Sequence, residues 1–384
     1  MSAARIVVVS YLAHDPFSPR GIRTRALVRE LERQRLVELI AAPAPSPATD
    51  GTPLLHRLTP LAARRWAGRL PDTVLIDRLE AWSRARFRTW EPQADGALLI
   101  GYPFSPLSYA ASRLAACGIP FAVDVGDPWA LTAAQPIVSG LGLARARRAE
   151  RALWSRAAAA IVTTEVQRDR LQKLFPALPV LVQPNGLDAV DAAPLAAPAP
   201  RGDGRLALAH FGSVYGARID IRPFLTRLAS SGAWREVDLA LFGSGGWSRH
   251  GLPDNVRLRH EIPVPWNEAV VRAREFDAAL VIGNIDEGQL PSKAVSYLTL
   301  PIPRIAVTLD RQRDATAEYA RSRPGWLVVS ADATDAARDV RRHVERRWRP
   351  EELAPPADES WDVVAARVVR FVDEAAWNRS STLR

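Results

Sequence analysis

The sequence predicts an α/β protein with two parallel-sheet domains in tandem. Short runs rich in Val, Ile and Leu alternate with amphipathic segments, which is the pattern of strand–helix–strand units joined by right-handed crossovers. Over 188–204 the pattern gives way to Ala, Pro, Asp and Gly without periodicity, which indicates a linker, and then it starts again. A length of 384 residues is too great for one typical core and suits two domains.

The first half of the chain begins with an apolar run over 5–10, which we expect to be a strand. A loop to Gly21 leads into a predicted helix over 22–34, with Leu27 and Leu31 on one face. Further strands are expected at 37–40, 97–100, 121–125, 160–163 and 180–183, with helices between them that include 141–157.

The second half repeats the alternation of strands and helices. Its strands are expected at 206–211, 238–242, 256–258, 278–283, 304–308 and 326–330, and its helices begin near 220 and cover 266–275. A last amphipathic helix is expected over 358–376. We therefore divide the chain into an N-terminal domain over 1–188, a C-terminal domain over 205–355 and a last helical segment over 356–384.

Composition bounds the class of protein. The chain is 47% apolar and 24% charged, the balance of a soluble globular protein, and its one cysteine, Cys117, excludes an internal disulfide and suits a reducing compartment. No stretch is long enough to span a bilayer, and the run at 5–10 is too short for a secretory core. A formal charge of +9 favours anionic partners, but zinc-ligand spacing and aromatic RNA-binding stretches are missing. We expect a cytoplasmic protein that does not bind nucleic acid.

The segment 64–88 is basic and aromatic. It holds seven arginines against three acids, interleaved with Trp66, Trp82 and Phe87. One interpretation is a surface for an anionic acceptor or for peripheral contact with the inner face of a membrane. The other is one or two amphipathic helices with a solvated face, and the sequence leaves both open.

The stretch from Asp286 to Leu298 is the strongest functional candidate. It follows the buried strand 278–283 and precedes a short helix that Pro291 can open at its first position. Lys293 then lies in the first turn, where the helix dipole disfavours a cation. A bound phosphate would remove that conflict, because free N–H groups at a helix start bind anions. A lysine that extends into water is the alternative.

Small or polar residues also follow other strands. Asp127 comes directly after the strand 121–125, at the edge of a parallel sheet where ligands bind in open α/β folds, although an aspartate that closes a turn before Pro128 is the alternative. The turns from Gly212 to Gly216 and over 243–246 would let the backbone approach a phosphate.

Several motifs occur in a fixed order over nearly the whole chain. They are Arg20-Gly21-Ile22-Arg23-Thr24, Asp124-Val125-Gly126-Asp127-Pro128-Trp129, Gln183-Pro184-Asn185-Gly186-Leu187-Asp188, Gly212-Ser213-Val214-Tyr215 and Pro291-Ser292-Lys293. Together they resemble a GT-B glycosyltransferase of the family 4 type, in which two Rossmann-like domains face each other across a cleft.

The resemblance implies retaining transfer of a sugar from a nucleotide-sugar to a glycan, lipid-linked or small-molecule acceptor. It implies a donor in the C-terminal half, an acceptor in the N-terminal half and a last helix that crosses back onto the first domain. A positioned cation can stabilise the leaving nucleoside diphosphate, so we expect no metal or other cofactor. Expected catalytic residues are Asp127, Arg218 and Lys293; donor-binding residues Gly212, Ser213, Gly216, Arg218, Gly288, Pro291, Ser292, Lys293 and Ser296; and acceptor-binding residues His14, Gly21, Arg23 and Tyr102.

One position departs from the family pattern. Three residues after the Pro-Ser-Lys lysine, the family usually has a glutamate that holds the ribose hydroxyls, and this chain has Ser296. A serine is shorter and uncharged, so it cannot bridge two hydroxyls as a carboxylate does. A non-catalytic binding or partner subunit of a glycan assembly complex is therefore the alternative function. An epimerase on a similar two-domain fold is a third hypothesis, for which the sequence offers no pair of catalytic carboxylates. The sequence does not name the sugar, the nucleobase or the acceptor.

Overall fold

The structure is a computed structural model of the chain, and it describes residues 4–15, 18–42, 77, 79–127, 129–130, 141–188, 202–214 and 219–377. The chain divides into two compact units. Unit 1 consists of Met1–Gly186 together with Trp361–Arg384, and unit 2 is the continuous segment Leu187–Ser360. Unit 1 is therefore assembled from two separate parts of the sequence.

Unit 1 is built on a six-stranded parallel sheet in the order β2-β1-β3-β4-β5-β6. Its central strands are buried on both faces, which explains why their buried residues are apolar except at Asp124 of β4. The strands are β1 (Arg5–Val9), β2 (Leu36–Ile40), β3 (Gly96–Ile100), β4 (Phe121–Val125), β5 (Ala159–Val162) and β6 (Val180–Val182).

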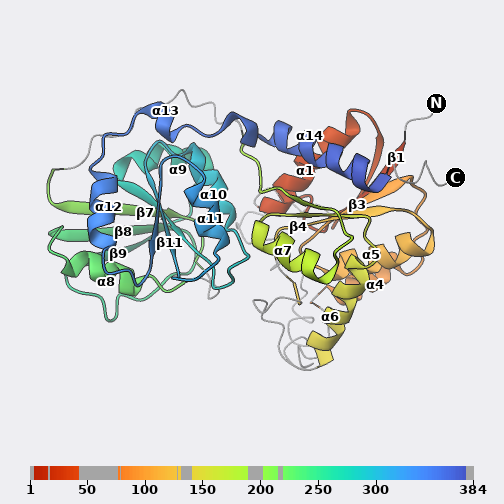
Figure 1. The fold of residues 1–384 in the computed structure, drawn as a ribbon, viewed down its shortest axis with the longest axis horizontal. Coiled ribbons are helices and arrows are strands. Elements are labelled where there is room, and N and C mark those ends of the chain that lie inside the picture. The colour runs from red at the N-terminus through yellow and green to blue at the C-terminus, as the bar shows by residue number, and fades with distance from the viewer. Residues whose placement is uncertain are drawn as a thin grey trace. The chain divides into compact units, whose positions relative to one another are not determined.

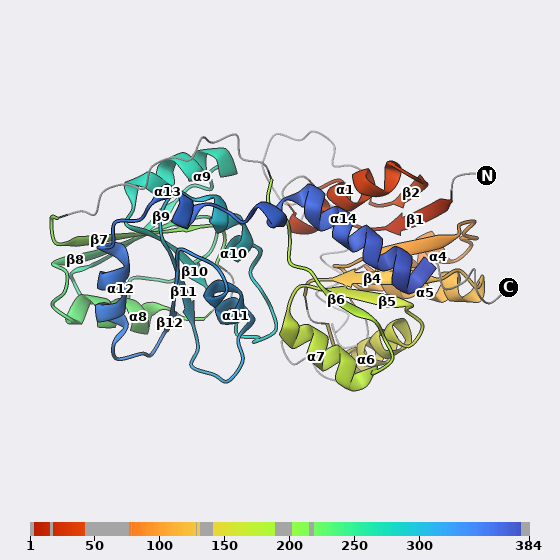
Figure 2. The same cartoon turned by 45° about the horizontal axis from the view of Figure 1, so that its top comes forward.

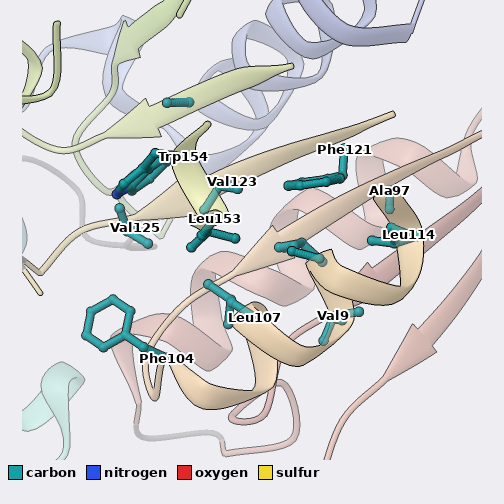
Figure 3. Packing of buried hydrophobic residues seen from close by; sticks show 14 of the residues in the cluster. Val9, Ala97, Phe104, Leu107, Leu114, Phe121, Val123, Val125, Leu153 and Trp154 are labelled. Atoms are coloured by element: carbon teal, nitrogen blue, oxygen red, sulfur yellow. The ribbon is translucent and has the colours of Figure 1, made fainter. Parts of the chain in front are cut away.

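Helices cover both faces of this sheet. They are α1 (Pro19–Glu32), α4 (Glu80–Phe87), α5 (Ser105–Ala116), α6 (Leu141–Trp154), α7 (Glu165–Leu174), α14 (Trp361–Val372) and the π-helix Asp373–Trp377. On one face, Leu27 of α1 and Val368 of α14 pack in one cluster against β1, β3 and β4, and α14 lies beside α1 (Figures 1 and 2). On the other face, Leu107 of α5 and Leu153 of α6 pack with Val123 of β4 (Figure 3).

Unit 2 repeats the plan with a second six-stranded parallel sheet, in the order β12-β11-β10-β7-β8-β9. Its strands are β7 (Arg205–Phe211), β8 (Glu236–Phe242), β9 (Val256–Glu261), β10 (Ala278–Ile282), β11 (Arg304–Thr308) and β12 (Trp326–Ser330).

The helices of unit 2 also lie on both faces of its sheet. They are α8 (Arg222–Ser230), α9 (Trp266–Arg272), α10 (Ser292–Ser296), α11 (Ala315–Arg321), α12 (Ala336–Val344) and α13 (Pro350–Leu353), with 3₁₀ turns at Ala273–Glu275, Tyr297–Thr299 and Ala357–Glu359. α8 and α12 share one buried cluster, and α9, α10 and α11 share the other. The order of the strands places β7 and β10, which carry the candidate residues, side by side at the centre.

The structure confirms the predicted strands and corrects some helix boundaries. α1 begins at Pro19, three residues before the predicted start, because the Ser18 side chain accepts a hydrogen bond from the Arg20 N–H and caps the helix. Pro291 is the N-cap of α10 and not its first helical residue. Of the basic segment 64–88, residues 64–76 and 78 lie outside the described residues, and α4 forms its C-terminal part. Within the described residues, every helix is too short or too polar to cross a membrane.

Candidate functional site

The end of β7 in unit 2 carries a glycine that a lysine covers. Gly212 has φ +136°, and a Cβ added there would lie 1.6 Å from Cε of Lys293. The positive φ favours glycine at this position, and the lysine side chain occupies the space that a Cβ would take; its Nζ donates to the Ser213 carbonyl at 3.3 Å. The structure thus brings together Gly212, Ser213 and Lys293, which were predicted from motifs about eighty residues apart.

The turn after β8 interlocks with the turn after β7. A Cβ on Gly243 would lie 2.4 Å from the carbonyl carbon of Gly212, and the Val214 N–H donates to the Ser244 carbonyl at 2.8 Å. The Ser244 hydroxyl in turn donates to Oγ of Ser213 at 2.8 Å. The hydroxyls of Ser213 and Ser244 therefore lie in the same pair of turns as the Ser213 carbonyl that Lys293 contacts. The glycine-rich turn 243–246 was noticed in the sequence, but Ser244 was not predicted as a site residue.

The segment that carries Lys293 is short and half-buried. Its helix α10 has five residues and follows Pro291, whose φ of −60° and ψ of 127° end the preceding extended stretch. So few aligned peptides make a weak dipole, and the Lys293 charge itself is the main electrostatic feature. Ser292, Lys293 and Ser296 are half-buried, and Oγ of Ser296 lies 3.5 Å from the Ser292 carbonyl.

Of three further predicted donor-site residues, Gly288 lies within the described residues, and Gly216 and Arg218 do not. The Gly288 N–H donates to Oδ1 of Asp286 at 2.7 Å, which closes the loop that leads into α10.

At the end of β4 in unit 1, Asp127 forms an ion pair. Nη2 of Arg20 lies 3.1 Å from Oδ2 of Asp127, whose side chain is 29% exposed. The guanidinium lies directly on Gly126, where an added Cβ would be 2.0 Å from Nη2 of Arg20. The guanidinium therefore occupies the space that a side chain at position 126 would take, and the ion pair presents a partly exposed carboxylate that can accept a hydrogen bond from a hydroxyl group.

Arg23, which we expected to contact an acceptor, is instead fully buried. Its Nε donates to Oδ2 of Asp124 at 2.7 Å, and Nη2 and Nη1 donate to the carbonyls of Gln183 at 3.2 Å and Pro184 at 3.1 Å. The guanidinium therefore joins α1 to β4 and to the segment after β6. This is a structural position, and it corrects the sequence-based expectation.

The remaining acceptor candidates occupy different surroundings. Gly21 is buried, and an added Cβ would lie 2.1 Å from the Asp15 carbonyl oxygen, so close packing of α1 on the 11–15 loop explains this glycine. His14 is exposed on that loop. Tyr102 is 37% exposed after β3, and its ring packs edge-on against Phe104 with centroids 5.9 Å apart.

Comparison with known proteins gives a family match for residues 21–186 and a shared fold for the whole chain. Residues 21–186 match the family model described as a glycosyl transferase 4-like domain. HepE of Anabaena in complex with UDP is similar in structure, with a TM-score of 0.58 and 10% identity over 97% of this chain and 100% of that one. A protein from Listeria monocytogenes that is named as a "putative UDP-N-acetylglucosamine 2-epimerase" gives a TM-score of 0.56 and 9% identity over 97% of this chain and 96% of that one. The S. aureus MnaA–UDP co-structure gives 0.53 and 11% over 96% of each chain. No curated protein matches this chain in sequence.

Proposed function

From the match of residues 21–186 to a glycosyl transferase 4-like domain and from the two-domain GT-B fold, we propose that the chain transfers a sugar from a nucleotide-sugar to an acceptor. Its acceptor is a glycan, a lipid-linked sugar or a small molecule, and the transfer retains the anomeric configuration. UDP is the first nucleotide to test, because the similar structures of HepE and MnaA hold UDP.

The observation that carries this proposal is the position of Lys293 over Gly212. A departing nucleoside diphosphate gains negative charge, and a cation fixed beside it stabilises that charge without reorganising. The lysine side chain lies over Gly212, its amine donates to the Ser213 carbonyl at 3.3 Å, and the hydroxyls of Ser213 and Ser244 are hydrogen-bonded to each other in the same pair of turns. In this proposal Lys293 and Arg218 stabilise the negative charge of the leaving diphosphate, which a metal ion does in other transferases.

Asp127 is proposed to act on the acceptor side. Its carboxylate is held by Arg20, and the exposed part of it can orient a sugar hydroxyl by accepting a hydrogen bond. His14, Gly21 and Tyr102 remain proposed neighbours of the acceptor.

Ser296 favours a second candidate function, a non-catalytic binding or partner subunit. Its hydroxyl lies on the same short helix as Lys293 and reaches only the Ser292 carbonyl, at 3.5 Å, among the hydrogen bonds of the described residues. It has no carboxylate with which to hold ribose. The two functions differ in whether bound donor is consumed, so hydrolysis or transfer assayed against UDP-, GDP-, ADP- and dTDP-sugars separates them.

Binding of nucleoside diphosphates to the Lys293→Ala variant tests the proposed donor site. The chain has two lysines, and Lys173, which is exposed in the last turn of α7, provides the matched control Lys173→Ala. Calorimetry should show a loss of about two to three kcal/mol of affinity in Lys293→Ala, since removal of a desolvated charge partner costs this much, and no change in the control. Equal affinity in the two variants would show that the donor diphosphate does not bind at Lys293.

The basic face of α4 is proposed to contact an anionic membrane. Arg84, Arg86 and Arg88 are exposed, and a groove of about 650 Å³ is lined by Glu80, Ala81, Arg84, Ala85 and Arg88. Anionic lipid contributes about 1 kcal/mol for each nearby arginine. Co-sedimentation with phosphatidylglycerol vesicles should weaken in Arg84→Gln/Arg88→Gln and not in the control Arg338→Gln/Arg342→Gln on α12. Equal sedimentation with neutral vesicles would leave α4 with a solvated face only.

A further inference from the structure

The end of β7 lacks a full strand neighbour on one side. β7 pairs with β8 along its whole length, from Arg205 to Phe211, but with β10 only at Leu208 and Ala209. In a parallel sheet the N–H and C=O of one residue point to the same side, and those of the next residue point to the other side. The Gly212 N–H donates to the β8 side, to the Phe242 carbonyl at 2.8 Å, so the polar groups of Phe211 face the β10 side.

A tyrosine side chain takes the place of the missing strand. The Tyr297 hydroxyl accepts from the Phe211 N–H at 2.6 Å and donates to the Phe211 carbonyl at 3.3 Å, and this side chain is fully buried. One residue earlier, Nδ1 of His210 lies 2.8 Å from the Leu280 carbonyl of β10. Immediately before Gly212, the His210 side chain therefore links β7 to β10, and the Tyr297 side chain links β7 to the segment after α10.

Tyr297 belongs to the segment that carries Lys293. The two residues are four apart, which is about one helical turn, so their side chains leave the same face of the segment. They contact consecutive residues at the end of β7: the Tyr297 hydroxyl binds Phe211, and the Lys293 side chain covers Gly212.

The backbone of this segment is fixed independently of the hydroxyl. Nε of the fully buried Arg304 donates to the Tyr297 carbonyl at 2.7 Å, and its Nη2 donates to the carbonyls of Leu298 at 2.9 Å and Leu300 at 2.8 Å. Loss of the Tyr297 hydroxyl would therefore remove the hydrogen bonds of Phe211 on the β10 side, while β7 stays paired with β8 and the segment 297–300 stays in place.

We propose that Tyr297 is a positioning residue. Its hydroxyl holds Phe211 and Gly212 in the position that lets the Lys293 amine contact a diphosphate. The identity of the ligand in this inference rests on the proposed function. The packing of Lys293 on Gly212, in contrast, is present in the ligand-free protein. Because small displacements of a binding group lose much of its contribution, we expect about a tenfold effect on affinity from one hydroxyl.

The test uses Tyr297→Phe, with Tyr319→Phe as the matched control. Tyr319 is a second buried tyrosine of unit 2, and its hydroxyl donates to Oε2 of Glu359 at 2.9 Å, in a contact that involves neither β7 nor α10. The first readout needs no ligand: acetylation of the ligand-free protein, followed by mass spectrometry, gives the labelling rate of Lys293 relative to that of Lys173. We expect this ratio to rise severalfold in Tyr297→Phe and to stay at the wild-type value in Tyr319→Phe.

The second readout is the affinity for the nucleoside diphosphate that wild type binds best, measured beside its parent nucleoside, which lacks phosphates. The diphosphate should bind Tyr297→Phe about tenfold more weakly, whereas the nucleoside should bind both proteins equally. An unchanged labelling ratio, or an equal loss for diphosphate and nucleoside, would overturn the positioning role. A changed ratio in a protein whose wild type binds no nucleoside diphosphate would support the positioning of Lys293 and would reject the proposed function.

Discussion

Two fully buried arginines, one in each unit, compensate their charge in different ways. Arg23 of unit 1 faces Asp124, and both side chains have an exposed fraction of 0% with 2.7 Å between Nε and Oδ2. Arg304 of unit 2 forms no ion pair within the described part of the chain. It donates instead to the carbonyls of Tyr297, Leu298, Leu300, Pro324 and Leu353.

The difference shows that a buried cation can be held by a carboxylate together with two carbonyls, as Arg23 is, or by carbonyls alone, as Arg304 is within the described residues. Burial lowers the pKa of Arg304 to about 9, so its guanidinium is still charged at neutral pH. The carbonyls of the 3₁₀ turn after α10 accept directly from the guanidinium, and their negative oxygen ends suit a cation. Arg23 depends on a partner 101 residues away in sequence, whereas three of the carbonyls that hold Arg304 lie within seven residues of it.

The largest effect is expected from Asp124→Ala. It leaves the Arg23 charge buried without its carboxylate, which costs about 3–5 kcal/mol of the free energy of unfolding. Urea denaturation with hydrogen exchange read separately for each unit should show the loss in unit 1. The double variant Arg23→Met/Asp124→Leu removes both charges and should lose less. A loss under about 1 kcal/mol in Asp124→Ala would mean that the carbonyls of Gln183 and Pro184 are enough to hold the buried Arg23 charge, as carbonyls hold Arg304 in unit 2.

A smaller effect is expected from Arg304→Lys. The ammonium group keeps the charge but cannot reach carbonyls on several sides as the guanidinium fork does, so about 3 kcal/mol should be lost, from hydrogen bonds between a charged donor and buried acceptors. The same denaturation experiment should place the loss in unit 2. Wild-type stability in this variant would show that the charge alone, and not the fork, holds the segment.

The smallest effect concerns pH and His343, which lies near Arg304. Burial, and then the positive charges of Arg346 and Arg304, lower the pKa of His343 to about 4, from 6.5. The unfolded chain therefore takes up this proton at a higher pH than the folded chain. The stabilisation is present above about pH 6.5 and is lost as the pH falls toward 4, by about 2 kcal/mol at pH 5. The variant His343→Gln should lose about that much less than wild type between pH 7 and pH 5; parallel pH profiles would contradict the shift.

The strands were predictable because parallel strands buried on both faces are continuous apolar runs. The helices α11 and α12 were missed, although Ala336, Val340 and Val344 are buried at a spacing of four residues that a periodicity count could have found.

The site was predictable only in part. Gly212 and Lys293 follow strand ends, which is a local signal, and their contact agrees with it. Arg23 lies in a motif that suggests ligand binding, and only the tertiary structure shows that its side chain is buried in an ion pair with Asp124. The contact of Tyr297 with Phe211 depends on where the pairing of β7 with β10 stops, which no local pattern records.

Because unit 1 consists of two separate segments of the chain, the order of synthesis has a consequence for its folding. α14 supplies Val368 and Val372 to the cluster that covers Leu27 and Leu31, and Gly186 packs so closely on Trp361 that an added Cβ would lie 2.8 Å from its Cα. Unit 2 is made entirely between these two points, and domains fold as units during synthesis. The first unit to begin synthesis is therefore the last to complete its core, and a nascent chain that ends at residue 360 exposes the apolar face that α14 will later cover.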